Sequence, residues 1–449
     1  MQCGWEPGRP YLVDPLPKQI SKAFADFLYG EDTKRTIENE AEQEHLDQID
    51  EENHLTTGFR RAVRMSSSEG EAWWKIHVNQ MIAQVPLLSW LSRLDVVPLF
   101  YGDRLLACAF VTEIAHETVN GEDPEASQAK VWRHFEVHAE GIVRNVLFCG
   151  SEDTVGALVG LEDQTATASL PEEWAHGLPM LAGRVVNDID EDAYLGESDY
   201  DQVEDYFYAL NEALTISTEN ARLTGKDRVF AAGRILQEDG GFNSGVEVFR
   251  QESEGGTLGE GEAPIVAIEK HYDSQSLWFH IVKLTTVALA RVGIVAQLVG
   301  EESDGNGADS SGVAIRLRFL PTINASEGKG SEYDAAEPQI IHRMMLLSAL
   351  PASTTEGVPG GFGKPYKGDK IPSVERADAL PADETELVNR TAVAVTSEIK
   401  SRRQAICDQH PDWTDEQVNA ELALIRQDIA APSAELPDDD DIDVDPHDA

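Results

Sequence analysis

The sequence predicts an α+β fold in which a region of antiparallel strands precedes a series of long helices. Short apolar or alternating runs, separated by glycine turns, follow one another between residues 96 and 148 and are typical of an antiparallel meander. From Val203 to Ala221, apolar or small residues recur at 4-3-4-3-4 spacing, which is the stripe of an amphipathic helix. Capping patterns then open further helices near the end of the chain.

The first 54 residues are expected to form an acidic N-terminal arm. Eight of the sixteen residues from Glu38 to Asn53 are acidic. Such a segment is either a solvated helix or an arm that orders only in an assembly. Trp73, Trp74 and Trp90 follow on a predicted helix, where they would cover one face of the meander.

The meander is expected to contain alternating or apolar strands that are separated by polar and glycine turns. These strands are Val96–Tyr101, Leu105–Ile114, Val131–His138 and Ile142–Phe148. His134 and His138 are four residues apart, which in a strand places them about 13 Å from each other, too far to share one metal ion. We therefore expect both to be solvent-facing.

Two helices flank a small insert with strand character. The first helix is expected to begin at Ser198 or Asp199, either of which is a suitable cap, and to stop at Gly225. The second, from Ser274 to Val299, is apolar around most of its circumference and must be buried within the subunit or between subunits. The insert contains the candidate strands Arg228–Leu236, Val246–Arg250 and Ile265–Ile268.

A polar loop, residues 301–311, precedes an element whose type the pattern leaves open. From Gly312 the residues suit a helix, but the alternation up to Phe319 also suits a strand, and Pro321 should bend or end either one. Helical character resumes at Tyr333. The remaining predicted segments are a Gly/Pro-rich linker at 351–372, a helical hairpin at 383–407 and 414–429, and a disordered acidic tail at 435–449.

Composition limits the possible functions. The chain has 449 residues, with 36 basic and 81 acidic side chains and a formal net charge of −45. Such a chain should not hold DNA tightly, because affinity for nucleic acid comes from neutralising phosphates. Four scattered cysteines form no disulfide framework, and Cys108 and Cys149 are expected to be reduced core residues. We predict no signal peptide and no membrane span.

No catalytic, cofactor-binding or metal-binding constellation is predicted. Gly363 and Lys364 do not belong to a phosphate-binding loop, because Val358 stands where that loop has its first Gly and Pro365 where it has Ser or Thr. The run that ends at Lys226 departs from the same pattern. There is no GxSxG elbow and no HExxH motif. Paired carboxylates carry little information in so acidic a chain. The acidic tail is interpreted as a solvated charge run.

Several stretches together resemble bacteriophage portal proteins, in particular the compact type of long-tailed phages. The most specific are the helix that contains Ala209–Ala213 and the Ser311–Ile315 start after a polar loop. The resemblance covers about residues 55–430 and rests on the order and spacing of the stretches. The other stretches are Glu71–Lys75, Val97–Glu113 and Ser198–Asn220, with the Ser311 run extending to Arg318.

The resemblance implies a portal-like plan, with an antiparallel-sheet wing, a two-helix stem, a small α/β clip insert, a kinked helix after a channel loop, and a helical crown. The corresponding segments are the arm 1–54, the wing 55–197, stem helix one 198–225, the clip 226–273, stem helix two 274–300, the channel loop 301–311, the kinked helix and linker 312–380 returning to the wing, the crown 381–434 and the acidic tail 435–449.

The resemblance further implies a non-enzymatic subunit of a ring of about twelve at one capsid vertex of a virion, assembled in the host cytoplasm. Its implied partners are double-stranded DNA that passes without tight binding, the terminase large subunit, the major capsid and scaffold proteins, and a head–tail adaptor. No cofactor and no membrane is implied. Two alternatives stay open, namely another phage head or tail assembly protein without a channel, and a cytoplasmic enzyme.

Two sets of site residues follow from these expectations. A collar around DNA in the channel loop would comprise Glu301, Glu302, Asp304, Gly305, Asn306, Gly307 and Asp309. Clip contacts with a partner would comprise Lys226, Arg228 and Arg234, which equally well balance local charge.

Overall fold

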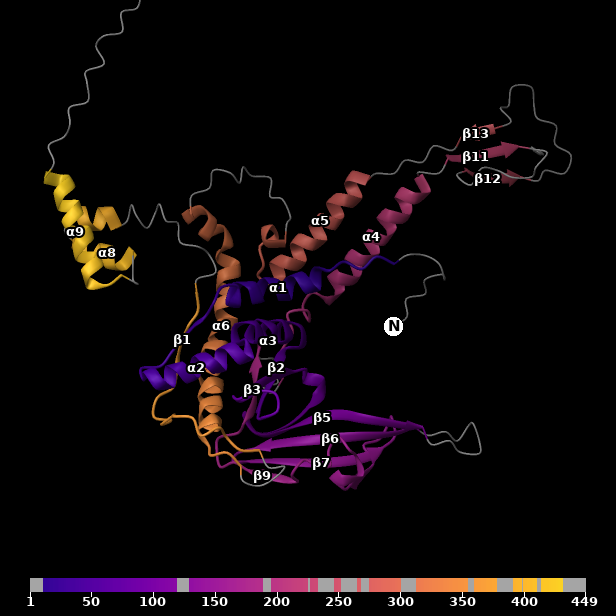
Figure 1. Ribbon diagram of the computed structural model, residues 1–449. Helices are drawn as coiled ribbons and strands as arrows, with labels where there is room; N and C mark the ends of the chain where they lie inside the picture. The colour runs from indigo at the N-terminus through magenta and orange to yellow at the C-terminus, as the bar shows by residue number, and fades with distance from the viewer. Residues whose placement is uncertain are drawn as a thin grey trace, which may run out of the picture. The chain divides into compact units, whose positions relative to one another are not determined.

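The chain, seen here in a computed structural model, mixes helices and sheets, which confirms the predicted α+β class (Figure 1). It divides into two compact units, Met1–Ala379 and Leu380–Ala449. The structure describes residues 11–118, 129–188, 195–224, 227–232, 246–251, 265–267, 274–299, 312–353, 359–377, 391–397, 399–409 and 413–430.

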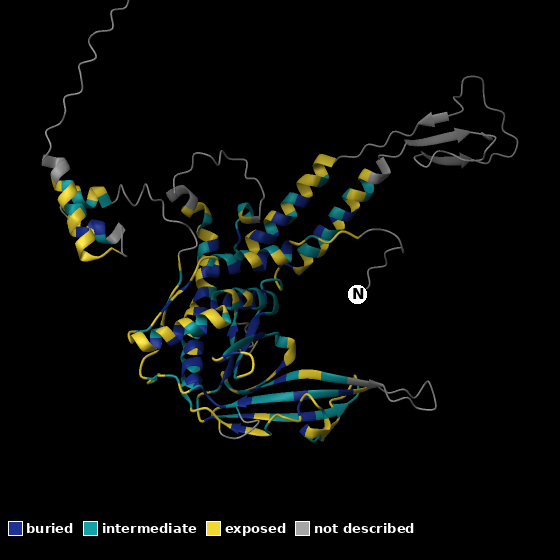
Figure 2. Cartoon of the chain, in the orientation of Figure 1, coloured by how far each residue is buried: buried dark blue, intermediate teal, exposed yellow. Residues whose placement is uncertain are grey.

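The N-terminal region belongs to the core of the first unit, so the interpretation of residues 1–54 as a separate arm is wrong for its described part. Helix α1 buries Leu16, Ile20 and Phe24 along one face, and helix α2 buries Leu46 and Ile49 (Figure 2). An apolar residue every three or four positions explains this burial despite the acidic composition. The elements are α1 (Leu16–Tyr29), β1 (Lys34–Thr36), α2 (Glu40–Asn53) and α3 (Leu55–Glu69).

The predicted helix carrying Trp73, Trp74 and Trp90 is wrong, because these tryptophans lie in strands. Helix α3 ends at Gly70, whose φ of 84° suits only glycine, and whose absent side chain makes room for the carbonyl of Gly196. Strand β2 then pairs on both sides, with Trp74 opposite Trp90. This three-stranded sheet has the order β10 (Ala182–Val186), β2 (Glu71–His77) and β3 (Leu87–Leu91).

The predicted meander is confirmed as the larger sheet of the first unit. All its strand pairs are antiparallel, and each strand pairs with the next along the chain from β4 to β8. Its strands are β4 (Val96–Tyr101), β5 (Arg104–Thr118), β6 (Ala129–Ala139), β7 (Ile142–Gly150) and β8 (Ala157–Val159), and β9 (Glu173–Ala175) also pairs with β7.

The expectation that His134 and His138 face solvent is wrong. Both are buried, and His138 is only 1% exposed. Their face of β6 also carries Glu136, which accepts a hydrogen bond from Lys75 of β2 and another from His138, at 2.8 Å. These contacts show that the polar side of β6 faces the smaller sheet. The Glu136 carboxylate can be buried there because the positive charge of Lys75 compensates it.

The cysteines of the described residues are free thiols. Cys108 is buried beside Phe110 in the layer between the two sheets, as predicted, and burial raises the pKa of its thiol to about 12. A thiol with so high a pKa is unreactive at neutral pH. Cys149 is only half-buried, at the edge where β7 meets β8.

Three long helices follow the sheets. Helix α6 continues through Pro321 and Pro338, so neither proline ends it, and the alternative of a strand after Gly312 is wrong. The second predicted helix is shorter than expected, since α5 ends before a turn at Gly293, where φ is 78°. The elements are α4 (Glu204–Thr224), α5 (Ser274–Arg291), the short 3-10 helix η4 (Ala296–Val299) and α6 (Gly312–Ala349).

The insert between α4 and α5 forms a small three-stranded sheet, which confirms its predicted strand character. Its central strand pairs in parallel with one neighbour and antiparallel with the other. The strands are β11 (Asp227–Ala232), β12 (Val246–Gln251) and β13 (Ile265–Ala267), in the order β12-β11-β13.

A buried ion pair joins the N-terminal region to α6. The Arg35 guanidinium donates from Nε and Nη2 to the same Glu337 carboxylate oxygen, at 2.8 and 2.6 Å, and Tyr29 donates to the other oxygen at 2.6 Å. The adjacent strand pair of β1 with β14 (Ser373–Glu375) further ties the two ends of this unit together.

The second unit is helical. The predicted second helix is confirmed as α9 (Asp415–Ala430), where Thr414 and Gln417 form the expected reciprocal cap. A single helix up to Cys407 is wrong. A short helical segment begins at residue 391 and ends before Ile399 and Lys400, whose amides both donate to the Ala394 carbonyl. A separate helix, α8 (Arg402–Gln409), follows. Among the described helices, none is long and apolar enough to cross a lipid bilayer.

Candidate functional site

Helices α4 and α5 form an antiparallel pair, and this pair is the candidate functional element (Figure 1). Leu210 and Ala213 are buried on α4, and Ile281 and Ala288 are buried on α5. The stripe predicted for α4 is therefore the face that packs. It is completed by a segment before α1, because the Leu12 and Asp14 amides donate to Thr215 and Asn211 of α4.

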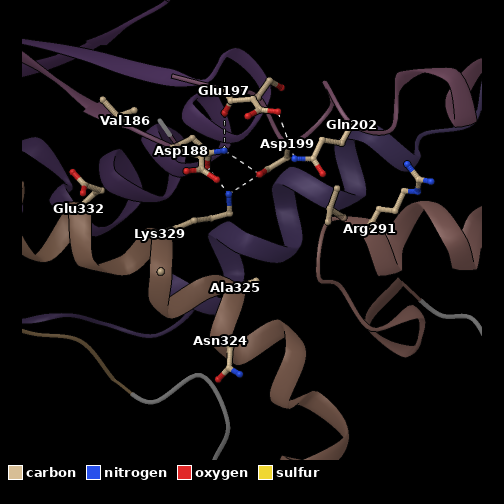
Figure 3. Close-up of a pocket in the computed structure, with 14 residues that line it drawn as sticks. Val186, Asp188, Glu197, Asp199, Gln202, Arg291, Asn324, Ala325, Lys329 and Glu332 are labelled. Carbon is tan, nitrogen blue, oxygen red and sulfur yellow. Dashed lines mark hydrogen bonds and ion pairs between the residues drawn. The ribbon is translucent and has the colours of Figure 1, made fainter. Parts of the chain in front are cut away.

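A polar cavity of about 430 Å³ lies where the pair meets α6 (Figure 3). Its walls come from the end of β10, the segment before α4, the end of α5 and the middle of α6. The lining residues are Val186, Asn187, Asp188, Glu197, Ser198, Asp199, Gln202, Arg291, Val292, Asn324, Ala325, Gly328, Lys329 and Glu332.

Lys329 is the central residue of this cavity. Its ammonium group donates to Asp199 Oδ1 at 2.6 Å and to Asn187 Oδ1 at 2.7 Å (Figure 3). The Asp199 carboxylate also accepts from Ser67 at the end of α3, at 2.6 Å. The Lys329 and Asp199 side chains are only 11% and 10% exposed, so water screens their attraction weakly.

The sequence predicted that Ser198 or Asp199 caps α4. This prediction is wrong, because neither residue caps the helix. The Ser198 hydroxyl donates to the Ser67 and Ser68 carbonyls, at 3.1 and 2.9 Å. Helix α4 itself begins later, at Glu204, with two acidic residues in its first turn that suit the helix dipole. The two polar residues thus fasten the root of α4 to the last turn of α3 and, through Lys329, to α6.

This arrangement suits a mechanical junction. The hydroxyl of Ser198 is engaged by backbone carbonyls, and the lining residues include neither histidine nor cysteine. The ammonium group of Lys329 is already matched by a carboxylate and an amide oxygen. Three segments far apart in the chain are therefore fixed together at the base of the α4/α5 pair.

The residues predicted for the channel loop, 301–311, lie outside the described residues, as do Lys226 and Arg234 of the predicted clip contacts. Arg228 lies in β11, opposite Glu247 of β12. Of the predicted site residues only Arg228 is among the described residues, so the roles of all of them stay predictions.

Sequence reasoning missed the junction because its partners are distant in the chain. Lys329 and Asp199 are separated by 130 residues, and Lys329 belongs to none of the stretches that the sequence analysis singled out. The one available signal was the Ser198-Asp199 pair, which has the composition of a helix cap but lies several residues before the first helical residue. In the described part of the chain, no group of His, Cys, Asp and Glu is arranged to hold a metal ion.

Comparisons with known proteins give partial structural similarity only. No protein-family model and no curated protein matches the chain. Three similar solved chains come from gene transfer agent particles. The first, from the virion of a native particle, has a TM-score of 0.44 and 10% identity, over 92% of this chain and 91% of that chain.

The second, from the neck of an empty particle computed with C6 symmetry, has a TM-score of 0.45 and 11% identity, over 86% of this chain and 87% of that one. The third, from the neck of a native particle computed with C12 symmetry, has a TM-score of 0.44 and 11% identity, over 87% and 88%. At TM-scores below 0.5 no conclusion about this chain follows, so its function is argued from its own residues.

Proposed function

We propose that this chain is the portal subunit of a phage-like particle, a non-enzymatic structural protein. Copies would form a ring of about twelve at one capsid vertex, as the resemblance of the sequence implies. DNA would enter and leave through the channel of that ring. The terminase motor and a head–tail adaptor would dock on it, and the capsid and scaffold proteins would surround it.

The observation that carries this proposal is the order of the elements around the α4/α5 pair. An antiparallel sheet precedes α4, a small sheet separates α4 from α5, and a 38-residue helix with two internal prolines follows. This order is the one that the portal plan implies for wing, stem, clip, stem and kinked helix. The junction around Lys329 supports the same role, because it fixes the base of the pair to α6.

The charge of the chain supports a conduit through which DNA moves. The subunit has a net charge of −45 and therefore repels phosphates. Salt limits this repulsion to distances of about 10 Å. Tight phosphate contacts would slow the passage of a duplex, since each contact must break as the DNA moves. A conduit is therefore better served by an acidic protein than by a basic one.

Negative-stain imaging of the purified full chain, together with mass photometry, tests the proposal. The expected result is a closed ring with a central hole wide enough for duplex DNA and a mass of roughly twelve times 49.3 kDa. A ring without such a hole would favour a different head or tail assembly protein. A persistent monomer would overturn the proposal and favour the enzyme alternative.

A further inference from the structure

Helices α1 and α3 form a positively charged surface in an otherwise acidic chain. Together they carry five basic and two acidic side chains, whereas the whole chain has a net charge of −45. The basic residues are Lys18 and Lys22 on α1, and Arg60, Arg61 and Arg64 on α3. Lys18, Lys22 and Arg61 are exposed to solvent. We call Lys18, Lys22, Arg61 and Arg64 together the basic patch.

The two helices lie side by side and run antiparallel (Figure 1). In the second half of α1 and the first half of α3, Asp26 pairs with Arg60. At the opposite end, the Pro17 and Ser68 carbonyls accept hydrogen bonds from hydroxyl groups that are two residues apart in the segment before α4. The helices are therefore in contact at both ends, and the two contacts fix which residues face each other between them.

One helical turn from the Asp26–Arg60 pair, this register places Lys22 beside Arg64. Two like charges thus lie together where the preceding turn has a matched pair. The Nε atom of Arg64 is buried and has no hydrogen-bond partner among the described residues. The other carboxylate of the two helices, that of Glu69, already accepts hydrogen bonds from the segment before β4. The basic patch therefore lacks an anion of its own.

We propose that the basic patch binds an acidic helix of a partner protein. An arginine side chain can donate two parallel hydrogen bonds to one carboxylate, so Arg64 together with Lys22 can hold the anion that this turn lacks. Lys18 and Lys22 are one helical turn, about 6 Å, apart, and carboxylates at every fourth position of a helix have the same spacing. This inference depends on the charges of α1 and α3 and not on the proposed portal function.

Duplex DNA fits the basic patch less well than an acidic helix does. A duplex carries about one negative charge per 1.7 Å of its axis and would extend far beyond two helical turns. The surface around the patch is acidic, and helix α2, which leads directly into α3, exposes Glu44, Asp47 and Glu51. A duplex would meet such carboxylates, whereas a short peptide helix can contact the patch alone.

A binding measurement with a synthetic peptide tests the proposal. The probe is a fluorescein-labelled peptide of four Glu-Ala-Ala-Ala repeats, and its fluorescence anisotropy is followed as the full-length chain is added. We expect binding at about 0.1 M salt that weakens at least tenfold at about 1 M salt, where screening shortens electrostatic attraction to about 3 Å. The same peptide with Gln in place of Glu should not bind. Carbodiimide crosslinking should join the probe to Lys18 or Lys22.

Two double variants show whether binding depends on the position of the charges. Lys18→Gln with Lys22→Gln removes two exposed charges from the patch and should lower the affinity for the peptide at least tenfold. The matched control, Lys34→Gln with Lys283→Gln, removes two exposed charges elsewhere, and its affinity should stay within twofold of the unchanged protein. Circular dichroism and thermal unfolding should show that both variants are folded.

Several outcomes would overturn the proposal. They are no binding of the Glu peptide, equal binding of the Gln peptide, and equal loss of affinity in the two double variants. Tighter binding of a DNA duplex that also depends on Lys18 and Lys22 would assign the patch to nucleic acid instead. Mass photometry that shows assembly lost only in the Lys18 and Lys22 variant would assign it to contact between copies. The portal proposal is tested separately, by ring formation of the unchanged protein.

Discussion

The buried contact between Arg35 and Glu337 illustrates how single residues hold the first unit together. The side chains are 2% and 1% exposed, and the partners are about 300 residues apart in the chain. Replacing Arg35 with alanine is expected to lower the free energy of unfolding by about 3–5 kcal/mol, because the Glu337 carboxylate remains buried without its cation. Urea denaturation of the purified protein measures this loss.

The matched control for this variant is Arg144→Ala. Arg144 also pairs with a carboxylate, that of Glu173, but 62% of its side chain is exposed. Exposed pairs contribute little, so the free energy of unfolding should change by less than about 1 kcal/mol. Equal losses in the two variants would show that burial does not determine the value of the Arg35 contact.

Lys329 is a second residue with a measurable structural role. Lys329→Met keeps the length of the side chain and removes the charge that Asp199 and Asn187 contact. We expect a loss of about 1–3 kcal/mol, the usual cost of leaving a buried hydrogen-bonding group without its partner. Hydrogen exchange should accelerate at the root of α4, whereas Lys22→Met should change neither quantity. Unchanged exchange would argue against a junction at this site.

At the scale of elements, the layer between the β10-β2-β3 sheet and the β4–β8 sheet should make the protein sensitive to acid. Burial lowers the pKa of His77 and of His134, and burial together with the nearby His138 lowers the pKa of His176 to about 4. Lys75 from β2 and Glu136 from β6 face this layer, and Arg184 of β10 lies over the Phe100 ring of β4 beside it. Burial alone would raise the pKa of Glu136, but the His138 hydrogen bond and the Lys75 charge hold it far below its usual value.

These shifts fix the direction of the pH dependence. Histidine in an unfolded chain titrates near pH 6.5, so between about pH 6.5 and 4 the unfolded state binds more protons than the folded state. The stability is therefore complete above that window and is lost as the pH falls through it. His176→Gln should flatten the dependence by up to about 1.4 kcal/mol per pH unit, the value for one proton.

Thermal or urea unfolding between pH 7.5 and 4.5 measures this slope. His280→Gln, at an exposed position of α5, serves as the control and should leave the slope unchanged. If His176→Gln has the same slope as the unchanged protein, protonation of this layer does not drive the acid sensitivity.

The elements also show what periodicity can and cannot predict. The strands β4 to β7, the packed stripe of α4 and the cap of α9 follow from local spacing, and all were predicted. Trp73 and His138 were placed wrongly because their surroundings depend on a second sheet. Trp74 opposite Trp90, and Lys75 against Glu136, are contacts between strands that no local pattern encodes. The contact of Asp199 with Lys329 could not be predicted either, because its partners are 130 residues apart in the chain.

At the scale of the whole molecule, the loop at residues 301–311 carries the main functional prediction. We expect its acidic residues and glycines to form a mobile collar around DNA in the ring. Deleting residues 304–309 is expected to leave ring assembly intact and to impair DNA packaging or retention, because the deletion removes the predicted collar and leaves the described residues of η4 and α6 in place. A same-length Gly/Ser replacement separates the effect of charge from that of length.

Two assays check this prediction. Negative-stain imaging shows whether the deleted protein still forms rings, and the amount of nuclease-protected DNA in assembled particles measures packaging and retention. Normal packaging together with normal retention would show that the loop is an ordinary connection between helices.

The antiparallel course of α4 and α5 has a consequence for how such a protein can diversify. The chain leaves the pair at Thr224 and returns at Ser274, at the same end of the pair. One contiguous stretch of gene therefore encodes the whole insert between the two helices, including the small sheet of β11, β12 and β13. Lengthening, shortening or replacing this insert would leave the sequences of α4 and α5, and the Lys329–Asp199 contact at their base, unchanged.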